Sequence, residues 1–163
     1  MDQPSEQHIR PDAQAISLAP IVGAEADQLL LLSDAYMASL YPAESNHLVS
    51  SESLRTGDAC FIGAFQRDRD GSGDEMTDQK PAAASSLETR CVACVAARFY
   101  RNEGYAEIKR LYVKERWRGA GLAKRLMARI EAEIVEQGTQ CARLEMGIYQ
   151  PEADALYRSL GYR

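Results

Sequence analysis

Hydrophobic residues recur along this chain with two different spacings, and each spacing predicts a type of secondary structure. Short apolar runs at residues 59–66 and 91–99 predict two strands that pair as an antiparallel hairpin, and residues 105–113 predict a third strand beside them. Apolar residues at helical spacing predict one helix over residues 23–40 and another from Leu122 to Gly138. The pattern therefore predicts a domain with a mixed sheet that is antiparallel in its first half.

Shorter segments complete the predicted order of elements. A strand is expected near Ala15–Leu18, and a short helix is expected at Glu52–Arg55. Residues 142–146 predict a strand that lies parallel to residues 105–113, because a helix separates the two. Pro151 suits the first turn of a final helix.

The helices also predict which side chains face the core. In the first helix we expect one apolar face, with Ser33 lying off it; that face consists of Leu29, Leu32, Tyr36 and Leu40. In the last helix we expect a buried stripe, which consists of Ala153, Leu156, Tyr157 and Leu160.

A glycine-containing turn joins the strand at residues 105–113 to the following helix. The first backbone N–H groups of a helix have no partner within the helix and lie at the positive end of its dipole, so they bind anions. Gly119 and Gly121 lack a Cβ and let a phosphate approach the main chain. Positive charge is supplied nearby by Arg116, Arg118, Lys124 and Arg125. The turn predicts a ligand that carries a phosphate or a pyrophosphate.

Two common phosphate-binding motifs do not fit this turn. The P-loop pattern G-x-x-x-x-G-K-[ST] is absent from the sequence. The dinucleotide pattern G-x-G-x-x-G fails because Lys124 stands where the third glycine would be.

The pattern R-x-x-G-x-G does fit, and with it the chain resembles the GCN5-related N-acetyltransferase superfamily. Arg116, Gly119 and Gly121 form this motif, and residues 153–162 match the superfamily's later block A-x-x-L-Y-x-x-x-G-[FY]. The resemblance implies a mixed, mostly antiparallel twisted sheet flanked by helices. It also implies that two neighbouring strands splay apart to hold the pantetheine arm of acetyl-CoA, whose pyrophosphate binds at the turn.

The resemblance assigns cofactor-binding roles to specific positions. The main chain of the strand would pair with pantetheine and the turn would bind the pyrophosphate; the positions are Leu111, Tyr112, Val113, Arg116, Arg118, Gly119, Ala120, Gly121, Leu122 and Ala123. Gln150 stands where many relatives have asparagine, seven residues before the tyrosine, so the expected hydrogen bond from that position is altered.

The resemblance also implies catalytic and acceptor-binding residues. Glu107 is the first candidate for the general base that deprotonates the amine, and Glu145 is the second. The alternative for Glu107 is a salt bridge with Lys109 or Arg110. Tyr157 would lie beside the coenzyme sulfur and donate a proton to it, whereas the alternative is a core aromatic residue. Acceptor contacts are expected from Glu44, Asn46 and His47, with a solvated loop as the alternative.

Length and composition limit the number of domains and the kinds of partner that we expect. The chain has 163 residues, of which 45% are hydrophobic, and it carries a net charge of −5. This length fits one domain, and the acidic balance argues against a nucleic-acid or membrane-surface partner. Residues 1–12 lack a signal-peptide core and are expected to be flexible, residues 13–163 are expected to form a single domain, and the location is expected to be cytoplasmic.

The segment at residues 67–89 is expected to be a disordered insertion, because it is polar and much longer than an ordinary hairpin loop. Its acidic residues fail the calcium-loop pattern, and we expect no metal site. Cys91 and Cys94 form a C-x-x-C, but residues three apart on a strand are expected to point to opposite faces.

The superfamily continues beyond the final G-[FY] with another strand, which this chain is expected to lack after Arg163. We therefore expect a sheet edge that a partner chain or the amino terminus covers, and a protein that is a homodimer or behaves poorly alone. The leading hypothesis is transfer of an acetyl group from acetyl-CoA to the primary amine of a small, amino-acid-like metabolite by direct attack. The alternatives are a non-catalytic acyl-CoA-binding module and a protein N-acetyltransferase.

Overall fold

The computed structural model describes residues 15–42, 54, 57–66 and 91–163. Several sequence predictions lie outside these residues: the flexible segment 1–12, the insertion at 67–89, and the acceptor residues Glu44, Asn46 and His47. The helix predicted at residues 52–55 is also outside them, apart from Leu54, which is buried.

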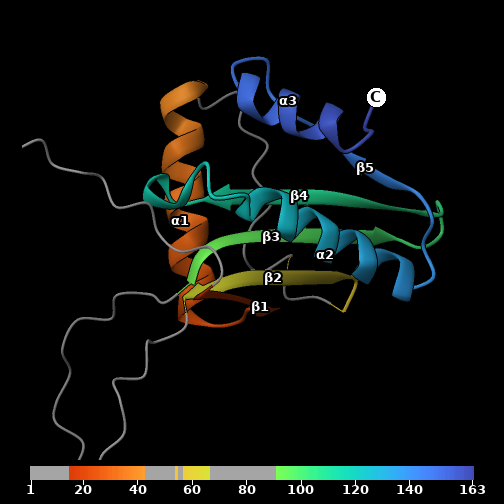
Figure 1. Cartoon of the computed structure of the whole chain (residues 1–163). Coiled ribbons are helices and arrows are strands. Elements are labelled where there is room, and N and C mark those ends of the chain that lie inside the picture. Colours follow the sequence, from red (N-terminus) through yellow and green to blue (C-terminus); the bar gives the residue numbers. More distant parts are fainter. Residues whose placement is uncertain (1–14, 43–53, 55–56, 67–90) are drawn as a thin grey trace, which may run out of the picture.

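Five strands form one sheet in the order β1-β2-β3-β4-β5 (Figure 1). Pairing is antiparallel from β1 to β4 and parallel between β4 and β5, as the sequence predicts. The strands are β1 (Ile16–Pro20), β2 (Ala59–Gln66), β3 (Cys91–Tyr100), β4 (Tyr105–Val113) and β5 (Ala142–Leu144). The mixed, mostly antiparallel sheet is thus confirmed.

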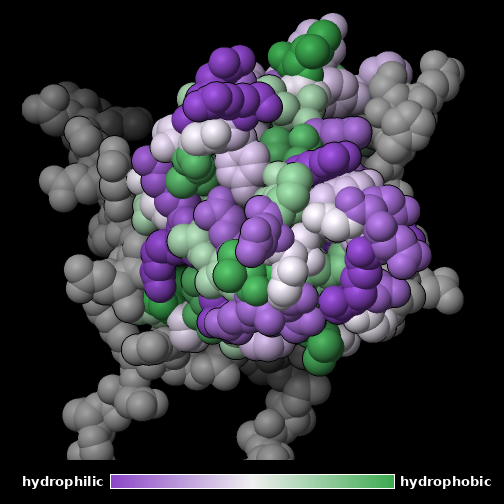
Figure 2. Space-filling model, turned by 90° about the vertical axis from the view of Figure 1, so that its right-hand side faces the viewer, coloured by the Kyte–Doolittle hydropathy of each residue, from purple (hydrophilic) through white to green (hydrophobic). Residues whose placement is uncertain are grey.

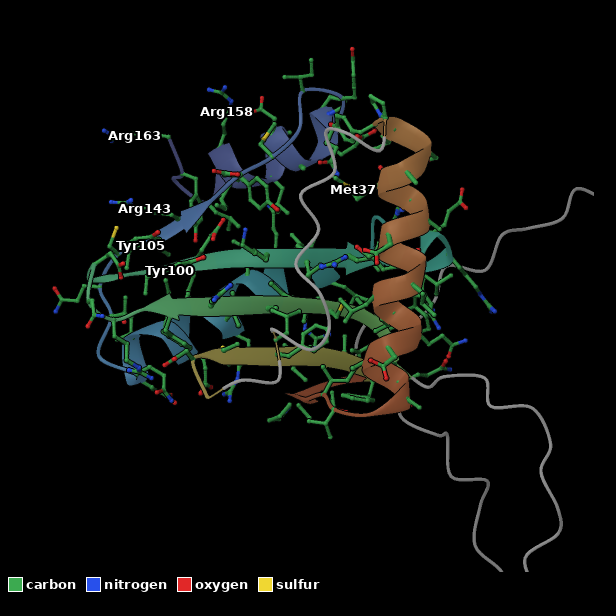
Figure 3. All side chains as sticks on the ribbon, turned by 180° about the vertical axis from the view of Figure 1, so that it is seen from behind. Met37, Tyr100, Tyr105, Arg143, Arg158 and Arg163 are labelled. Atoms are coloured by element: carbon green, nitrogen blue, oxygen red, sulfur yellow. The ribbon has the colours of Figure 1, made fainter. Side chains whose placement is uncertain are left out.

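Helices cover both faces of the sheet. α2 (Leu122–Glu136) packs across one face and α1 (Ala24–Leu40) across the other, while α3 (Pro151–Ser159) lies beside β5 (Figures 1 and 3). The larger core lies under α2, where side chains of the strands meet the helix residues Leu122, Leu126, Met127, Ile130 and Ile134. A short 3₁₀ turn, η4 (Glu115–Trp117), connects β4 to the glycine turn, and Trp117 anchors it in the core.

The buried face of α1 differs from the predicted one. Ala26, Leu29, Leu30 and Ser33 are buried, whereas Leu32 is 38% exposed. The prediction for Leu32 and Ser33 was wrong because a run of four leucines satisfies more than one helical stripe. Contacts with the sheet, rather than the count of apolar residues, select the face that includes Ser33.

The prediction that Cys91 and Cys94 point to opposite faces was also wrong. The pairing of β2 with β3 shifts between Ala64 and Phe65, so the strict alternation of β3 is broken near Cys91. Both thiols are fully buried in one cluster with Leu29 of α1. The bulge brings them to the same face.

The last two elements are shorter or less buried than predicted. β5 ends at Leu144 instead of residue 146. No residue of α3 is fully buried, although Tyr157 and Leu160 pack against the larger core from the predicted side. Within the described residues β5 pairs only with β4, so α3 has a narrow strand to cover.

The surface at one end of the sheet is predominantly polar. Figure 2 views the end where β4 begins and α2 ends, and hydrophobic side chains there form separate patches between hydrophilic ones. None of the described helices is long and apolar enough to cross a membrane.

Candidate active site

β4 and β5 stop pairing part-way along β4, at the edge of the sheet. They pair only from Ala106 opposite Ala142 to Ile108 opposite Leu144, while β4 continues to Val113. The second half of β4 therefore has no strand partner on its β5 side among the described residues, and we call this unpaired side the opening. The family resemblance implies that two strands splay apart at this point to hold the pantetheine arm.

A bulge in β4 lies where the strands separate. The register between β3 and β4 shifts between Cys94 and Ala96, and on β4 Arg110 has a positive φ of 59°. After the bulge Leu111 and Val113 pack toward the core under α2, while Tyr112 packs on the α1 side. The bulge thus reverses which side chains face each helix.

The bulge also determines which backbone groups face the opening. Lys114 donates its N–H to the carbonyl of Val92 on β3, at 3.0 Å. Because backbone groups of successive strand residues point to opposite edges, those of Val113 point away from β3, toward the opening. This geometry suits the expected main-chain pairing of Leu111–Val113 with an extended ligand.

An ion pair with α1 holds the bulge in place. The Arg110 guanidinium bonds to the Asp34 carboxylate, and the Arg110 side chain is only 6% exposed. The carbonyl of Arg110 accepts a weak hydrogen bond from the Cys94 thiol at 3.5 Å. A residue with unfavourable backbone geometry is therefore fixed on both sides.

The glycine turn has the open geometry that an anion site needs. Gly119 and Gly121 have φ values of 74° and 77°, and a Cβ added to either would meet no atom within 4 Å. Gly121 is the N-cap of α2, and no side chain caps the helix there. The first amides of α2, from Leu122 and Ala123, are thus positioned to bind a phosphate.

The arginine and lysine side chains near the glycine turn make different contacts. Arg118 lies over the ring of Tyr36 at 4.6 Å, and its Nε donates to the carbonyl of Val113 at 3.1 Å, so it lies at the rim of the opening. Arg125 donates to the carbonyl of Ile16 at 2.8 Å and thereby supports β1. Arg116 and Lys124 are exposed beside the turn.

The predicted catalytic residues line one cavity. Its volume is about 1070 Å³, and it borders β4, β5, α3 and the end of α2. Glu107, Glu145 and Tyr157 all contribute to its wall. The structure therefore brings together three residues that are distant in sequence.

Glu107 is held by two neighbours. Its Oε1 lies 2.5 Å from Nζ of Lys109, and its Oε2 accepts a hydrogen bond from the Tyr100 hydroxyl at 3.2 Å. The side chain is 14% exposed. The salt bridge with Lys109 that the sequence offered as an alternative is present, whereas Arg110 pairs with Asp34. The carboxylate is thus fixed in orientation while it borders the cavity.

Tyr157 is partly buried, with its ring 6.0 Å from that of Tyr162. Burial raises the pKa of the Tyr157 phenol above its usual value, so the hydroxyl keeps its proton at neutral pH. Tyr162 in turn donates to Glu131 of α2 at 2.8 Å. The phenol of Tyr157 is a proton donor in the cavity wall.

Gln150 supports the loop between β5 and α3. Its Oε1 accepts from the N–H of Gly147 at 3.4 Å, and its Nε2 lies 3.6 Å from the sulfur of Met37. The hydroxyl of Tyr41 accepts from the N–H of Tyr149 at 2.9 Å. The end of α1 is thereby tied to this loop, and Gln150 has a structural contact there.

Sequence patterns missed the polar residues that surround Glu107. Tyr105 and Arg143 line the same cavity, and Arg143 lies 4.2 Å above the ring of Tyr105. Only the strand register reveals them, because it places Arg143 directly opposite Glu107. Within the described residues no group of His, Cys, Asp and Glu is arranged to hold a metal ion.

Comparisons with known proteins agree with this geometry. The family model described as "Acetyltransferase (GNAT) family" matches residues 52–162, which is more than half of the chain. An "IAA acetyltransferase" from Azospirillum brasilense is 35% identical over 135 residues, covering 83% of this chain and 74% of that protein.

Solved structures share the fold. An acetyltransferase of the GNAT family from Staphylococcus aureus superposes with a TM-score of 0.64 at 12% identity, covering 91% of this chain and 85% of that one. A protein from Clostridium acetobutylicum, described as a predicted acetyltransferase with acetyl-CoA, gives a TM-score of 0.57 at 13% identity and covers 91% and 90%. The splayed strands, the open glycine turn and the matched family model lead to one conclusion: the chain belongs to the GNAT acetyltransferase family and is an enzyme that transfers an acyl group from acyl-CoA.

Proposed function

We propose that the protein transfers the acetyl group of acetyl-CoA to the primary amine of a small metabolite. The observation that carries the proposal is the cavity shared by Glu107 and Tyr157 beside the opening between β4 and β5. A candidate proton acceptor and a candidate proton donor on the wall of one cavity support direct acyl transfer, which uses both. Acetyl-CoA supplies an activated thioester carbonyl when it is bound.

The residues of the glycine turn fit the coenzyme. Gly119 and Gly121 leave space in front of the first amides of α2, and the adjacent Arg116 is exposed. The backbone of β4 offers N–H and C=O groups along the opening, although Arg118 occupies the carbonyl of Val113. Binding at this edge would require Arg118 to release that carbonyl or to share it.

Glu107 would act as the general base. An ammonium acceptor must lose a proton before its nitrogen can attack the thioester carbonyl, and the oriented carboxylate of Glu107 takes that proton directly or through a water. The new bond joins nitrogen to the acetyl carbon, and the bond between that carbon and sulfur breaks. Tyr157 donates its phenolic proton to the departing sulfur, because the raised pKa keeps that proton in place, and the second proton that nitrogen loses as the amide forms restores the phenol.

Glu145 is the second candidate for the base. It lies just beyond β5, lines the same cavity and is exposed. Its exposure leaves the side chain less fixed than that of Glu107. We expect Glu107→Gln to lower kcat by two or more orders of magnitude, within the range of about 10² to 10⁴ for general-base catalysis, and Glu145→Gln to lower it less. An equal loss in both variants, or a larger one in Glu145→Gln, would reassign the base.

Calorimetric titration of acetyl-CoA tests the coenzyme site. Gly119→Glu should abolish binding, because a carboxylate would occupy the anion site. Gly138→Glu is the matched control, since Gly138 at the other end of α2 has a φ of 81° and also has no atom within 4 Å of an added Cβ. Binding that survives in Gly119→Glu and is lost in Gly138→Glu would place the coenzyme elsewhere.

Thiol release from acetyl-CoA with a panel of amines tests the reaction. Turnover with small amines, and its loss in Glu107→Gln with coenzyme affinity retained, supports the proposal. Turnover that appears only with a protein or peptide would mean that the acceptor is a macromolecule and not a small metabolite. Coenzyme binding without turnover for any acceptor would refute the proposal.

A further inference from the structure

Six side chains form a continuous polar layer on the face of the sheet that α1 covers in part. Strand register places Arg98 opposite Glu107 and Tyr100 opposite Tyr105 between β3 and β4. It also places Glu107 opposite Arg143 between β4 and β5. Directly opposed residues share a face of the sheet, as do residues two apart such as Glu107 and Lys109. We call this set of residues, 98, 100, 105, 107, 109 and 143, the arginine–tyrosine layer.

Ring contacts order this layer. Tyr100 and Tyr105 stack with their ring centres 4.8 Å apart and their planes at 14°. Arg98 lies 5.5 Å from the ring centre of Tyr100, and Arg143 lies 4.2 Å from that of Tyr105. Figure 3 shows Tyr100, Tyr105 and Arg143 on one side of the molecule, near Arg163. An arginine thus lies against each ring of the stacked pair.

The layer is positively charged within an acidic protein. The charged residues of β3, β4 and β5 are Arg98, Glu107, Lys109, Arg110 and Arg143, and Arg110 is committed to Asp34. Lys109 balances Glu107, whereas neither Arg98 nor Arg143 forms a salt bridge with any of the described residues. The chain as a whole carries a net charge of −5. Arg143, which is held on the ring of Tyr105 and lines the cavity, is a suitable partner for an anionic group.

The carboxylates that line the cavity do not neutralise Arg143. Glu131 accepts a hydrogen bond from Tyr162, and Asp154 pairs with Arg158 at 2.7 Å. Glu145 lines the cavity and directly follows Leu144, the last residue of β5 that pairs with β4. The cavity wall therefore offers carboxylates for an ammonium group and Arg143 for a carboxylate.

We infer that the acceptor is an amine that also carries a carboxylate, and that Arg143 binds this carboxylate. The inference rests on the proposed function, because it specifies the acceptor at the same site. Arg143 lines the cavity and is exposed, so it is reachable by a ligand, and Tyr105 fixes its position. With the carboxylate on Arg143, the amine of the acceptor lies toward Glu107, the residue directly opposite.

Matched acceptors test the inference. Each α-amino acid is assayed beside its carboxamide and the amine that lacks the carboxyl group, with thiol release from acetyl-CoA as the readout. We expect kcat/KM for the acid to exceed that of its two analogues by about tenfold to a hundredfold, as for other charged hydrogen bonds. Equal or better turnover of the decarboxylated amine would overturn the inference and leave the proposed function standing. Turnover of none of the amines would instead refute the proposed function.

Arg143→Gln tests the residue itself. It should raise KM for the acid by about tenfold or more, leave turnover of the decarboxylated amine within about twofold, and leave acetyl-CoA binding unchanged. Arg143→Lys should recover part of the loss. Arg101→Gln is the matched control, since Arg101 also lies over an aromatic ring, Phe99 at 5.2 Å, but outside the cavity. An equal loss for the acid and the decarboxylated amine in Arg143→Gln would assign this arginine to folding and overturn the inference.

Discussion

Asp34→Asn should destabilise the protein more than any ordinary surface substitution. Asp34 pairs with Arg110, whose side chain is 6% exposed, while that of Asp34 is 38% exposed. Breaking a buried ion pair by removing one partner costs about 3–5 kcal/mol, because the other charge stays buried. Solvent at Asp34 reduces this cost, so we expect a loss of about 2 kcal/mol. For a domain of this size that corresponds to a fall in Tm of roughly 4–8 °C.

The matched control is Asp154→Asn, which breaks the exposed pair between Asp154 and Arg158 within α3. Helix pairs four residues apart contribute about 0.3–0.5 kcal/mol, so its Tm should fall by less than about 2 °C. Thermal unfolding of both variants and of the wild type, followed by circular dichroism, measures the difference. A fall in Asp34→Asn no larger than that in Asp154→Asn would refute the claim that this pair fixes the bulge.

Four further measurements follow from the packing. Cys141 is exposed, whereas burial raises the pKa of the Cys60 thiol to about 11, so at pH 8 an aromatic disulfide reagent should label Cys141 first and Cys141→Ser should remove the fast phase. Because the pKa of the Cys60 thiol is raised above its ordinary value of 9.0, its contribution to stability is complete below pH 9.0 and declines as the pH rises toward 11, which alkaline unfolding would measure. Gly147→Ala should cost about 1–3 kcal/mol in chemical denaturation, because its new Cβ would lie 2.0 Å from the Tyr41 hydroxyl oxygen. Because β5 pairs only with β4 among the described residues, light scattering should detect a dimer at high concentration, and a monomer throughout would count against that expectation.

The sequence predicted the elements that local chemistry specifies. The glycine turn was recognisable because positive φ values at Gly119 and Gly121 require residues without a Cβ. The parallel pairing of β5 followed from the helix between it and β4. Elements with one strong local signal were therefore correct in type and nearly correct in length.

Side-chain direction was harder to predict, because it depends on strand register. The bulge near Cys91 overturned the expectation of opposite faces for the C-x-x-C, and no local signal marks it. The leucine run of α1 is compatible with several faces, so only packing against the sheet selected Ser33 over Leu32. The residues around Glu107 were missed for the same reason, since Arg98 and Arg143 are neighbours of Glu107 only across strands.

The bulge at Arg110 connects these observations to the chemistry of the site. On a regular strand Glu107, Lys109 and Leu111 would share one face, but the bulge sends Leu111 into the core under α2 and places Tyr112 on the α1 side. Glu107 precedes the bulge and remains in the paired part of β4, where strands on both sides hold it rigidly. The backbone after the bulge is left facing the opening. In the proposed mechanism this local irregularity therefore separates the paired half of β4, which carries Glu107, from the unpaired half that we expect to face the coenzyme, and its ion pair with Asp34 ties α1 to the boundary between them.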